Sequence, residues 1–212
     1  MKIAVFGASG RIGSRVVNEA LSRGLDVTAV VRHPENYTGE RPHLKVAKGD
    51  IFKTQEVESC AFDHDVVVSA YNNTRGVPPS TIAEVAVPLI NGLKQAHVKR
   101  LIIVGGAGTL EVKPGLQLVD TPDFPPAYKA AALAQREALK IYQKETELEW
   151  TYISPAAETA PGERTGNFRT GGNQLIIDSS GRSFITMEDL AVAIVDEILN
   201  RQHIRQHFTV GY

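Results

Sequence analysis

The chain has little cysteine, few aromatic residues and no excess of charge of either sign. Cys60 is its only cysteine, which excludes an internal disulfide and a cysteine-based metal cluster. There are 23 lysines and arginines against 24 acidic residues, a net charge of −1. This balance gives no electrostatic reason to expect nucleic acid or an anionic membrane surface as a partner. We therefore expect neither.

Long apolar stretches are also missing. No run approaches the roughly 20 apolar residues that a membrane span needs, and strand-like sequence follows Met1 directly, so we expect neither a span nor a signal peptide. The simplest expectation is a cytoplasmic protein in which Cys60 is a small buried filler. A length of 212 residues, 42% of them hydrophobic, is enough for one domain, residues 1–212, with a full core.

The most informative stretch is the glycine-rich segment at residues 3–13. An apolar run ends in Gly7, Gly10 and Gly13, spaced three apart, and a helical pattern follows at once. A strand, a tight turn and a helix start in this order are typical of a dinucleotide-phosphate site. Gly7 would allow the turn, Gly10 would let a pyrophosphate approach the backbone, and Gly13 would bring the helix close to the sheet. The start of the helix would offer free N–H groups and a partial positive charge. An ordinary strand–helix turn without a ligand is the alternative.

Strand-like and helix-like segments alternate along the rest of the chain. The nearly all-apolar segment 27–31 is typical of a strand buried on both faces of a parallel sheet. We predict an α/β fold with a doubly wound, mostly parallel sheet and right-handed crossovers. The predicted strands are 3–6, 27–31, 44–46, 65–70, 101–104, 150–153 and 208–210. The predicted helices are 12–21, ended by Gly24, then 54–60, 82–97 with a kink at Pro88, and 127–142.

Near its end the chain predicts a small hairpin and a last helix. Residues 174–178 and 183–186 flank a Ser-Ser-Gly-Arg turn, and Thr186 opens the helix with a capping-box-like pattern. Irregular segments follow the fourth, fifth and sixth strands, at 71–79, 109–126 and 157–174. All three should emerge beside the glycine loop at the carboxyl edge of the sheet, where such sheets bind substrates.

Two residues at strand ends point to the cofactor. Arg32 ends the second strand, about 20 residues beyond the glycines. An acidic residue there would suit the ribose 2′-hydroxyl of NAD, whereas a basic one suits the 2′-phosphate of NADP. Arg32, helped by His33, therefore favours NADP over NAD; the alternative is a solvated arginine. Asp50 follows the third strand, where it could contact a ligand or cap the helix that begins near Thr54.

The six histidines do not predict a metal site. Only His203 and His207 have a ligand-like i, i+4 spacing. With Arg201 and Arg205 around them, we interpret this pair as part of a solvated turn.

Motifs along the whole chain resemble those of a known family. They are the glycine loop, Val30-Val31-Arg32, Gly49-Asp50, Val104-Gly105-Gly106-Ala107-Gly108, Ser154-Pro155-Ala156, Pro161-Gly162-Glu163-Arg164-Thr165-Gly166 and Ile185-Thr186-x-x-Asp189. The chain resembles the atypical short-chain dehydrogenase/reductases of the NAD(P)H-binding, NmrA-like group. It is most similar there to bacterial proteins assigned as NADH-flavin reductases, and more distantly to the flavin reductase called biliverdin reductase B. The resemblance implies a Rossmann fold.

The resemblance also implies roles for the matching positions. The implied cofactor contacts are Gly7, Ser9, Gly10, Arg11, Ile12 and Gly13 for the pyrophosphate, Arg32 for the 2′-phosphate, Asp50 and Ile51 for the adenine, Ala70 and Tyr71 for the ribose, and Ser154, Pro155 and Ala156 near the nicotinamide. Gly105 is a further candidate for contact with the cofactor. Candidate contacts to the substrate are Asn72, Gly106 and Arg164, the last through an acceptor phosphate; a surface arginine in a loop is the alternative for Arg164.

The acid–base residues of the wider superfamily do not carry over. That superfamily uses a serine after the fifth strand and a Tyr-x-x-x-Lys pair on the next helix. Here the serine region reads Gly105-Gly106-Ala107-Gly108, and Tyr128 is followed four residues later by Ala132. Lys129 would point in another direction on a helix. Tyr128 is thus a weak catalytic candidate and more simply a packing residue.

These observations leave three functions open. The first is hydride transfer from NADPH to a flavin or quinone-type small molecule, which needs stacking and exclusion of water more than a protein acid. The second is a non-catalytic NAD(P)-binding redox sensor, as NmrA-like relatives suggest. An epimerase- or isomerase-like enzyme is a third, disfavoured by the missing Tyr–Lys pair. We expect a monomer or a homodimer, formed through helices 82–97 and 127–142.

Overall fold

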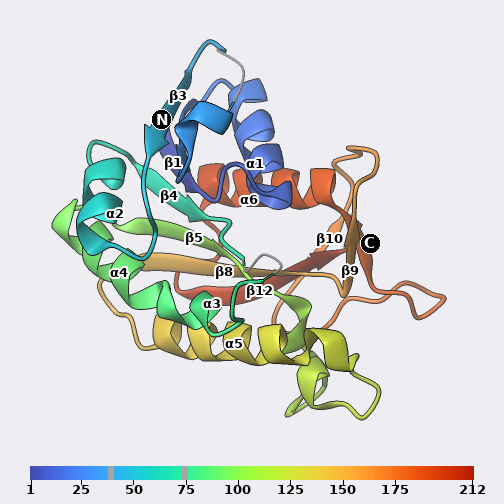
Figure 1. The fold of residues 1–212 in the computed structure, drawn as a ribbon. Helices are drawn as coiled ribbons and strands as arrows, with labels where there is room; N and C mark the ends of the chain where they lie inside the picture. The colour runs from blue at the N-terminus through green and yellow to red at the C-terminus, as the bar shows by residue number, and fades with distance from the viewer. Residues whose placement is uncertain (38–40, 73–75) are drawn as a thin grey trace.

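The computed structural model describes residues 1–37, 41–72 and 76–212. Eight of the described strands form one sheet in the order β10-β12-β8-β5-β4-β1-β2-β3, with β1 near its middle (Figure 1). Every neighbouring pair is parallel except β10 and β12. This confirms the predicted doubly wound, mostly parallel sheet. The strands are β1 (Lys2–Phe6), β2 (Asp26–Val31), β3 (Leu44–Lys48), β4 (Val66–Ser69), β5 (Arg100–Val104), β8 (Glu149–Pro155), β10 (Arg169–Gly171) and β12 (Gln206–Gly211).

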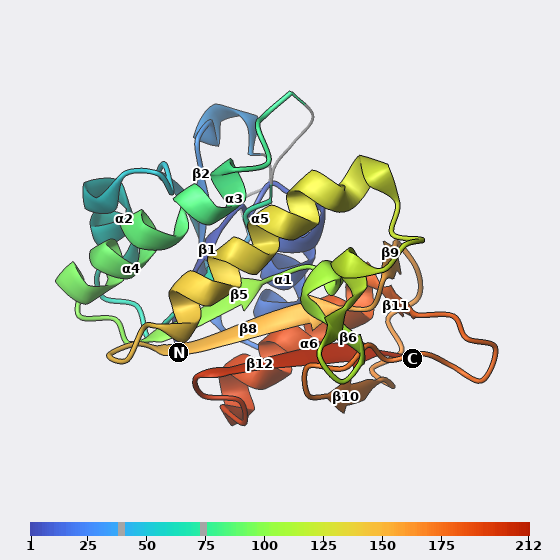
Figure 2. The same cartoon turned by 90° about the horizontal axis from the view of Figure 1, so that it is seen from below.

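Helices cover both faces of the sheet, as Figures 1 and 2 show. One face carries α1 (Arg11–Ser22) and α6 (Met187–Asn200). The other carries α2 (Thr54–Ala61), α3 (Thr81–Glu84), α4 (Ala86–Gln95) and α5 (Pro126–Gln143). Successive strand residues point to opposite faces, so Val5 belongs to the core beside α1 and α6, and its neighbour Phe6 to the other. No described helix has the length and apolar character to cross a membrane.

Local sequence signals explain where the helices begin and end. Gly24 has a φ of +73° just after α1, and its N–H donates to the Leu21 carbonyl at 3.0 Å, which is the expected role of a glycine there. The Thr186 hydroxyl caps α6 by accepting from the Asp189 N–H at 3.1 Å. The predicted helix 82–97 is divided into α3 and α4, because Pro88 has no N–H to donate to the carbonyl four residues earlier.

The predicted hairpin over 174–186 is wrong. Its tight turn exists, with the Asp178 N–H donating to the Arg182 carbonyl at 2.8 Å. The second arm, β11 (Phe184–Thr186), however, pairs in parallel with β9 (Glu158–Ala160). The first arm is drawn away because its backbone pairs with Glu111: Glu111 donates to Asn173, and Leu175 donates to Glu111.

Two segments predicted to be irregular hold short elements. Residues 109–126 contain the two-stranded pair β6 (Glu111–Lys113) and β7 (Leu116–Gln117) and the 3-10 helix η3 (Leu118–Asp120), preceded by η2 (Ala107–Thr109). Residues 157–174 contain β9 and β10. Another 3-10 helix, η1 (Pro34–Asn36), follows β2. Strands of two or three residues leave little periodic signal in a sequence.

Candidate functional site: the carboxyl edge of the sheet

The glycine loop is shaped by very close backbone contacts. Gly7 has a φ of +78° and accepts a hydrogen bond from the Gly10 N–H at 2.9 Å. A Cβ on Gly13 would lie 2.1 Å from the Gly7 oxygen, and a Cβ on Gly7 would lie 2.8 Å from the Ala70 oxygen. Real Cβ atoms do not approach backbone this closely, so both positions require glycine. The loop thereby presses the start of α1 against the ends of β1 and β4.

The first turn of α1 is open to an anion. Ser14 is the first residue whose N–H bonds inside the helix, to Gly10 at 3.0 Å. The preceding N–H groups, of Arg11, Ile12 and Gly13, have no hydrogen-bond partner among the described residues. Gly10 caps the helix without a side chain, and no acidic residue occupies the first turn. The residues present therefore fit a phosphate group, since unpaired N–H groups and the helix dipole both favour negative charge.

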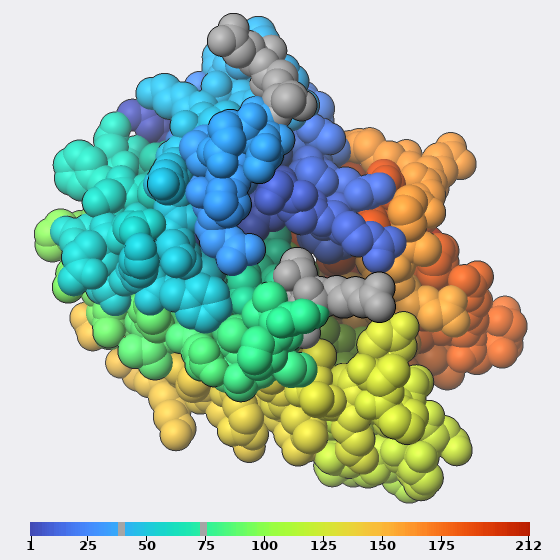
Figure 3. Space-filling model, viewed as in Figure 1, coloured from blue at the N-terminus to red at the C-terminus, as the bar shows by residue number. Residues whose placement is uncertain are grey.

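The other predicted cofactor residues end neighbouring strands at the same edge. Because β1, β2, β3, β4, β5 and β8 are parallel, the segments after them emerge together. Figure 3 shows segments from the start of the chain (blue), after Gly76 (green) and at the start of α5 (yellow) gathered on one face. The order of the sheet reverses beside β1, which is where open α/β sheets bind their ligands.

Asp50, Ile51 and Tyr71 lie at the ends of β3 and β4. The Asp50 carboxylate accepts from the Phe52 N–H at 3.1 Å. It does not cap α2, whose N-cap is Lys53, so the capping alternative is wrong. Ile51 is buried. The Tyr71 ring meets Phe52 edge-on at 5.5 Å, and its hydroxyl donates to Thr81 at 3.1 Å.

Arg32 directly follows β2 and its side chain is exposed. No described residue forms an ion pair or hydrogen bond with it. Its neighbour His33 is instead paired with Glu35, 3.1 Å away. A guanidinium without a protein partner at this strand end is available to an anionic ligand.

The segment after β5 and β8 is packed more tightly than its sequence indicates. A Cβ on Gly105 would lie 2.0 Å from the Tyr152 ring, so the glycine makes room for that tyrosine. Ser154 is fully buried, and its hydroxyl contacts Thr109 at 3.0 Å and His207 at 2.9 Å. Pro155 is half-buried and Ala156 is buried. The Ser154 side chain therefore faces the interior, not the edge.

Arg164 does not reach this edge. Its guanidinium makes two hydrogen bonds of 2.7 Å to the carboxylate of Glu19, which lies on α1 between one and two turns beyond Gly13. These bonds and those from Arg23 hold the pKa of Glu19 below its usual value. The prediction that Arg164 binds an acceptor phosphate is therefore wrong, because the buried carboxylate of Glu19 already occupies it.

The remaining substrate and catalytic candidates differ in their exposure and surroundings. Gly106 is half-buried beside Gln135 of α5. Asn72 is exposed, whereas Asn73, Thr74 and Arg75 of the same predicted loop lie outside the described residues. Tyr128 is in the first turn of α5 and is 67% exposed, so the packing role expected for it is wrong.

His203 and His207 are not part of a solvated turn, contrary to the prediction. His203 stacks on Phe208 with ring centroids 3.8 Å apart and pairs with Glu197 at 2.8 Å. His207 lies on β12, its ring edge-on to Tyr152, and burial lowers its pKa to about 4. Sequence reasoning missed this cluster; the available signal was the alternation of polar His207 and Thr209 with apolar Phe208 and Val210 in one strand.

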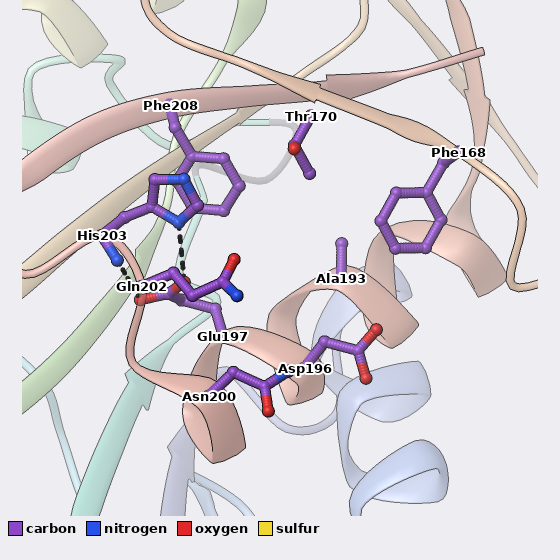
Figure 4. A pocket seen from close by; sticks show the side chains of 9 residues that line it. All are labelled: Phe168, Thr170, Ala193, Asp196, Glu197, Asn200, Gln202, His203 and Phe208. Atoms are coloured by element: carbon purple, nitrogen blue, oxygen red, sulfur yellow. Dashed lines mark hydrogen bonds and ion pairs between the residues drawn. The ribbon is translucent and has the colours of Figure 1, made fainter.

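A second hollow, of about 140 Å³, lies between α6 and the strands β10 and β12 (Figure 4). Its wall includes Glu197, which is 3% exposed and lies 2.5 Å from the equally buried Arg100. Both Glu197 oxygens are engaged, by Arg100 and His203, and Asp196 pairs with Arg23. The carboxylates of this hollow are therefore occupied by protein cations, and we assign no ligand to it.

Cys60 and the acidic side chains of residues 1–37, 41–72 and 76–212 provide no metal centre. Cys60 is 8% exposed, as expected of a buried filler, and burial raises the pKa of its thiol. Across the described ranges, no group of three histidine, cysteine, aspartate or glutamate side chains is arranged to hold a metal ion.

The chain is similar to known proteins along its whole length. A curated relative from Bacillus subtilis (strain 168), the "Uncharacterized protein YwnB", is 37% identical over 99% of this chain and 98% of its own length. A solved structure from Burkholderia pseudomallei, described as a "putative exported protein", is 48% identical over the whole of both chains, with a TM-score of 0.92. Another from Streptococcus pneumoniae, described as a "putative NADH-flavin reductase", is 30% identical over 100% of this chain and 99% of its own, with a TM-score of 0.87.

The family of this chain is shown by a family match over most of its length, and the open first turn of α1 agrees with that family. The NAD(P)H-binding family matches residues 7–201, from the first loop glycine to the end of α6. The matched region holds the open first turn of α1 and every predicted cofactor residue. The cytoplasmic location expected from the sequence stays a prediction. The chain belongs to the NAD(P)H-binding family and has the Rossmann-type fold of its oxidoreductases.

Proposed function

We propose that this protein is a reductase that transfers hydride from NADPH to a flavin or quinone-type acceptor. The observation that carries the proposal is the open first turn of α1, whose three unpaired N–H groups lie at the edge where β1, β4 and β5 end. This arrangement fits a dinucleotide pyrophosphate. The bound nicotinamide supplies the hydride chemistry.

The protein's own residues would bind and orient. The loop from Gly7 to Gly13 would hold the pyrophosphate through backbone N–H groups, and Arg32 would pair with the 2′-phosphate. In the Gly105-Gly106 segment, Gly105 is buried against Tyr152 and the half-buried Gly106 presents backbone without a side chain, which suits a flat ring. Stacking of two ring systems and exclusion of water are then the main contributions of the protein.

The residues argue against chemistry that needs a protein acid. Four residues after Tyr128 stands Ala132, and the segment after β5 has glycine and alanine where a serine would polarise a carbonyl. Alcohol–ketone interconversion and epimerisation both rely on such a group. A flavin or quinone accepts hydride into a conjugated ring and can take its proton from solvent. The Streptococcus pneumoniae relative described as a "putative NADH-flavin reductase" supports the same acceptor class.

The test is direct. Purified protein is mixed with NADPH and FMN, riboflavin or a simple quinone, and absorbance at 340 nm is followed. Arg32→Ala should weaken NADPH binding by about 10- to 100-fold, the size of one lost charge-assisted hydrogen bond, and leave NADH binding unchanged. Lys99→Ala, an exposed cation at the opposite edge of the sheet, is the matched control and should change neither.

A non-catalytic redox sensor is the second candidate, favoured by the same missing acid–base pair. A sensor would bind NADPH and NADP⁺ with different affinities and turn over no acceptor. Tight NADPH binding without oxidation by any of the acceptors would replace the reductase proposal with the sensor.

A further inference from the structure

A line of hydrogen bonds runs from β12 to the segment after β5. His207 Nε2 lies 2.9 Å from the Ser154 hydroxyl, which lies 3.0 Å from the Thr109 hydroxyl. Thr109 donates to the Gly106 carbonyl at 2.9 Å. Ser154 and Thr109 are 0% and 1% exposed, so solvent does not compete for these bonds.

The number of protons available determines which group donates in each hydrogen bond between His207 and the Gly106 carbonyl. The Gly106 carbonyl can only accept, so it uses the single proton of Thr109. Ser154 must then donate its own proton to Thr109. His207 must therefore carry its proton on Nε2 and donate to Ser154. In this arrangement each hydroxyl donates once: Ser154 accepts from His207, and Thr109 accepts from Ser154 and also lies 3.4 Å from His207 Nε2.

The surroundings of His207 keep its ring neutral. Burial lowers its pKa to about 4. The titratable group in contact with it is Tyr152 on β8, edge-on at 5.6 Å, and burial also raises the pKa of that tyrosine, well above its usual value. Tyr142 of α5 lies behind Tyr152, at 6.1 Å. A neutral histidine between neutral tyrosines and hydroxyls has one proton to donate, on one nitrogen.

The geometry points to His207 as a positioning residue: acting through Ser154 and Thr109, it turns the Gly106 carbonyl inward and fixes Gly105-Gly106 as the floor on which the reacting ring lies. The kinetic part of this inference rests on the proposed reductase function. This line of hydrogen bonds is not a proton relay, because it ends at the Gly106 carbonyl, which cannot pass a proton on.

Three variants separate positioning from relay. His207→Gln keeps an amide N–H near the place of Nε2 but cannot shuttle a proton. His207→Phe keeps the ring and loses the donor. Thr109→Val is isosteric and removes the hydroxyl bond to the Gly106 carbonyl, which then keeps only the longer bond from the Thr109 N–H at 3.3 Å. For each NADPH-loaded protein, two quantities are measured: amide hydrogen exchange at Thr109 and Leu110, whose N–H groups close the η2 turn, and the steady-state rate with FMN.

The Thr109→Val and His207→Phe proteins should exchange these amides about tenfold faster and lose about tenfold in kcat, with the KM for NADPH unchanged. His207→Gln should stay within about threefold of the wild type in both measurements. A kcat for His207→Gln as low as that of His207→Phe would overturn positioning in favour of a relay. Unchanged exchange in Thr109→Val, or faster exchange with unchanged kcat, would also overturn it. A wild-type protein that oxidises no NADPH would refute the reductase function, while the exchange data would still decide whether His207 holds the floor.

Discussion

Acidification should destabilise the folded protein through His207. Its ordinary pKa of 6.5 falls to about 4 in the folded state because the ring is desolvated. The unfolded chain therefore takes up this proton first as pH falls. Stability is fully present above pH 6.5, decreases below it, and loses nothing more from this group once pH is below about 4.

The size of the effect follows from the two pKa values. A difference of 2.5 units between 6.5 and about 4, at about 1.36 kcal/mol per unit, gives a total of roughly 3.4 kcal/mol. Most of that range lies above pH 5, so about 2 kcal/mol should be lost between pH 7.5 and pH 5. This is a sizeable share of the roughly 5–15 kcal/mol by which a domain is stable.

Urea unfolding at pH 7.5 and pH 5 measures the loss. The wild type and His207→Gln are compared as a difference of differences, so that carboxylates and the other histidines cancel. The variant should lose about 2 kcal/mol less than the wild type over this interval, whatever its absolute stability. Equal losses in the two proteins would refute the reasoning, because His207 would then titrate alike in the folded and unfolded states.

Two further changes test the packing. Gly13→Ala places a Cβ 2.1 Å from the Gly7 oxygen, so it should destabilise the protein by about 1–3 kcal/mol and weaken NADPH binding at least tenfold. Thermal unfolding and NADPH titration measure these two effects. Gly172→Ala, where an added Cβ meets no atom within 4 Å, is the neutral control. Glu197→Gln leaves the buried Arg100 without its counter-charge and should cost about 3–5 kcal/mol in urea unfolding, whereas Lys140→Ala, which breaks an exposed pair, should cost less than about 1 kcal/mol. Equal effects of Gly13→Ala and Gly172→Ala would contradict the crowding inferred at Gly13. Equal effects of Glu197→Gln and Lys140→Ala would contradict the cost inferred for leaving Arg100 without its counter-charge.

The geometry of the glycine loop could be predicted from sequence because it depends on short-range features. The spacing of Gly7, Gly10 and Gly13 within a strand–turn–helix unit fixes the loop with little help from the rest of the chain. The position of Arg32 follows from the length of the same unit. The topology was equally accessible, since apolar strands alternating with amphipathic helices allow few arrangements.

The contacts of the segments around Gly106 and Ser154 could not be predicted because they join distant parts of the chain. Ser154 meets Thr109 and His207, 45 and 53 residues away in sequence, and no local pattern records such a meeting. Arg164 was misassigned for the same reason, since its partner Glu19 is 145 residues away. The hairpin near residue 180 was wrong because a tight turn does not determine which strands pair on either side of it.

The glycine loop and the segment after β5 are thus built by different means. The glycine loop is shaped by close backbone contacts among Gly7, Gly13 and Ala70. The helix that follows it, α1, is held to α6 by the ion pair between Arg15 and Glu188 at 2.6 Å. We expect an added side chain at Gly7 or Gly13 to disturb the loop. The segment after β5 is held by a few side-chain hydrogen bonds, those of Thr109 to Gly106 and Ser154 among them. Substitutions there should change the shape of the proposed acceptor floor at Gly105-Gly106 while the glycine loop stays intact. We therefore expect variation in that segment to change the choice of acceptor before it changes the affinity for NADPH.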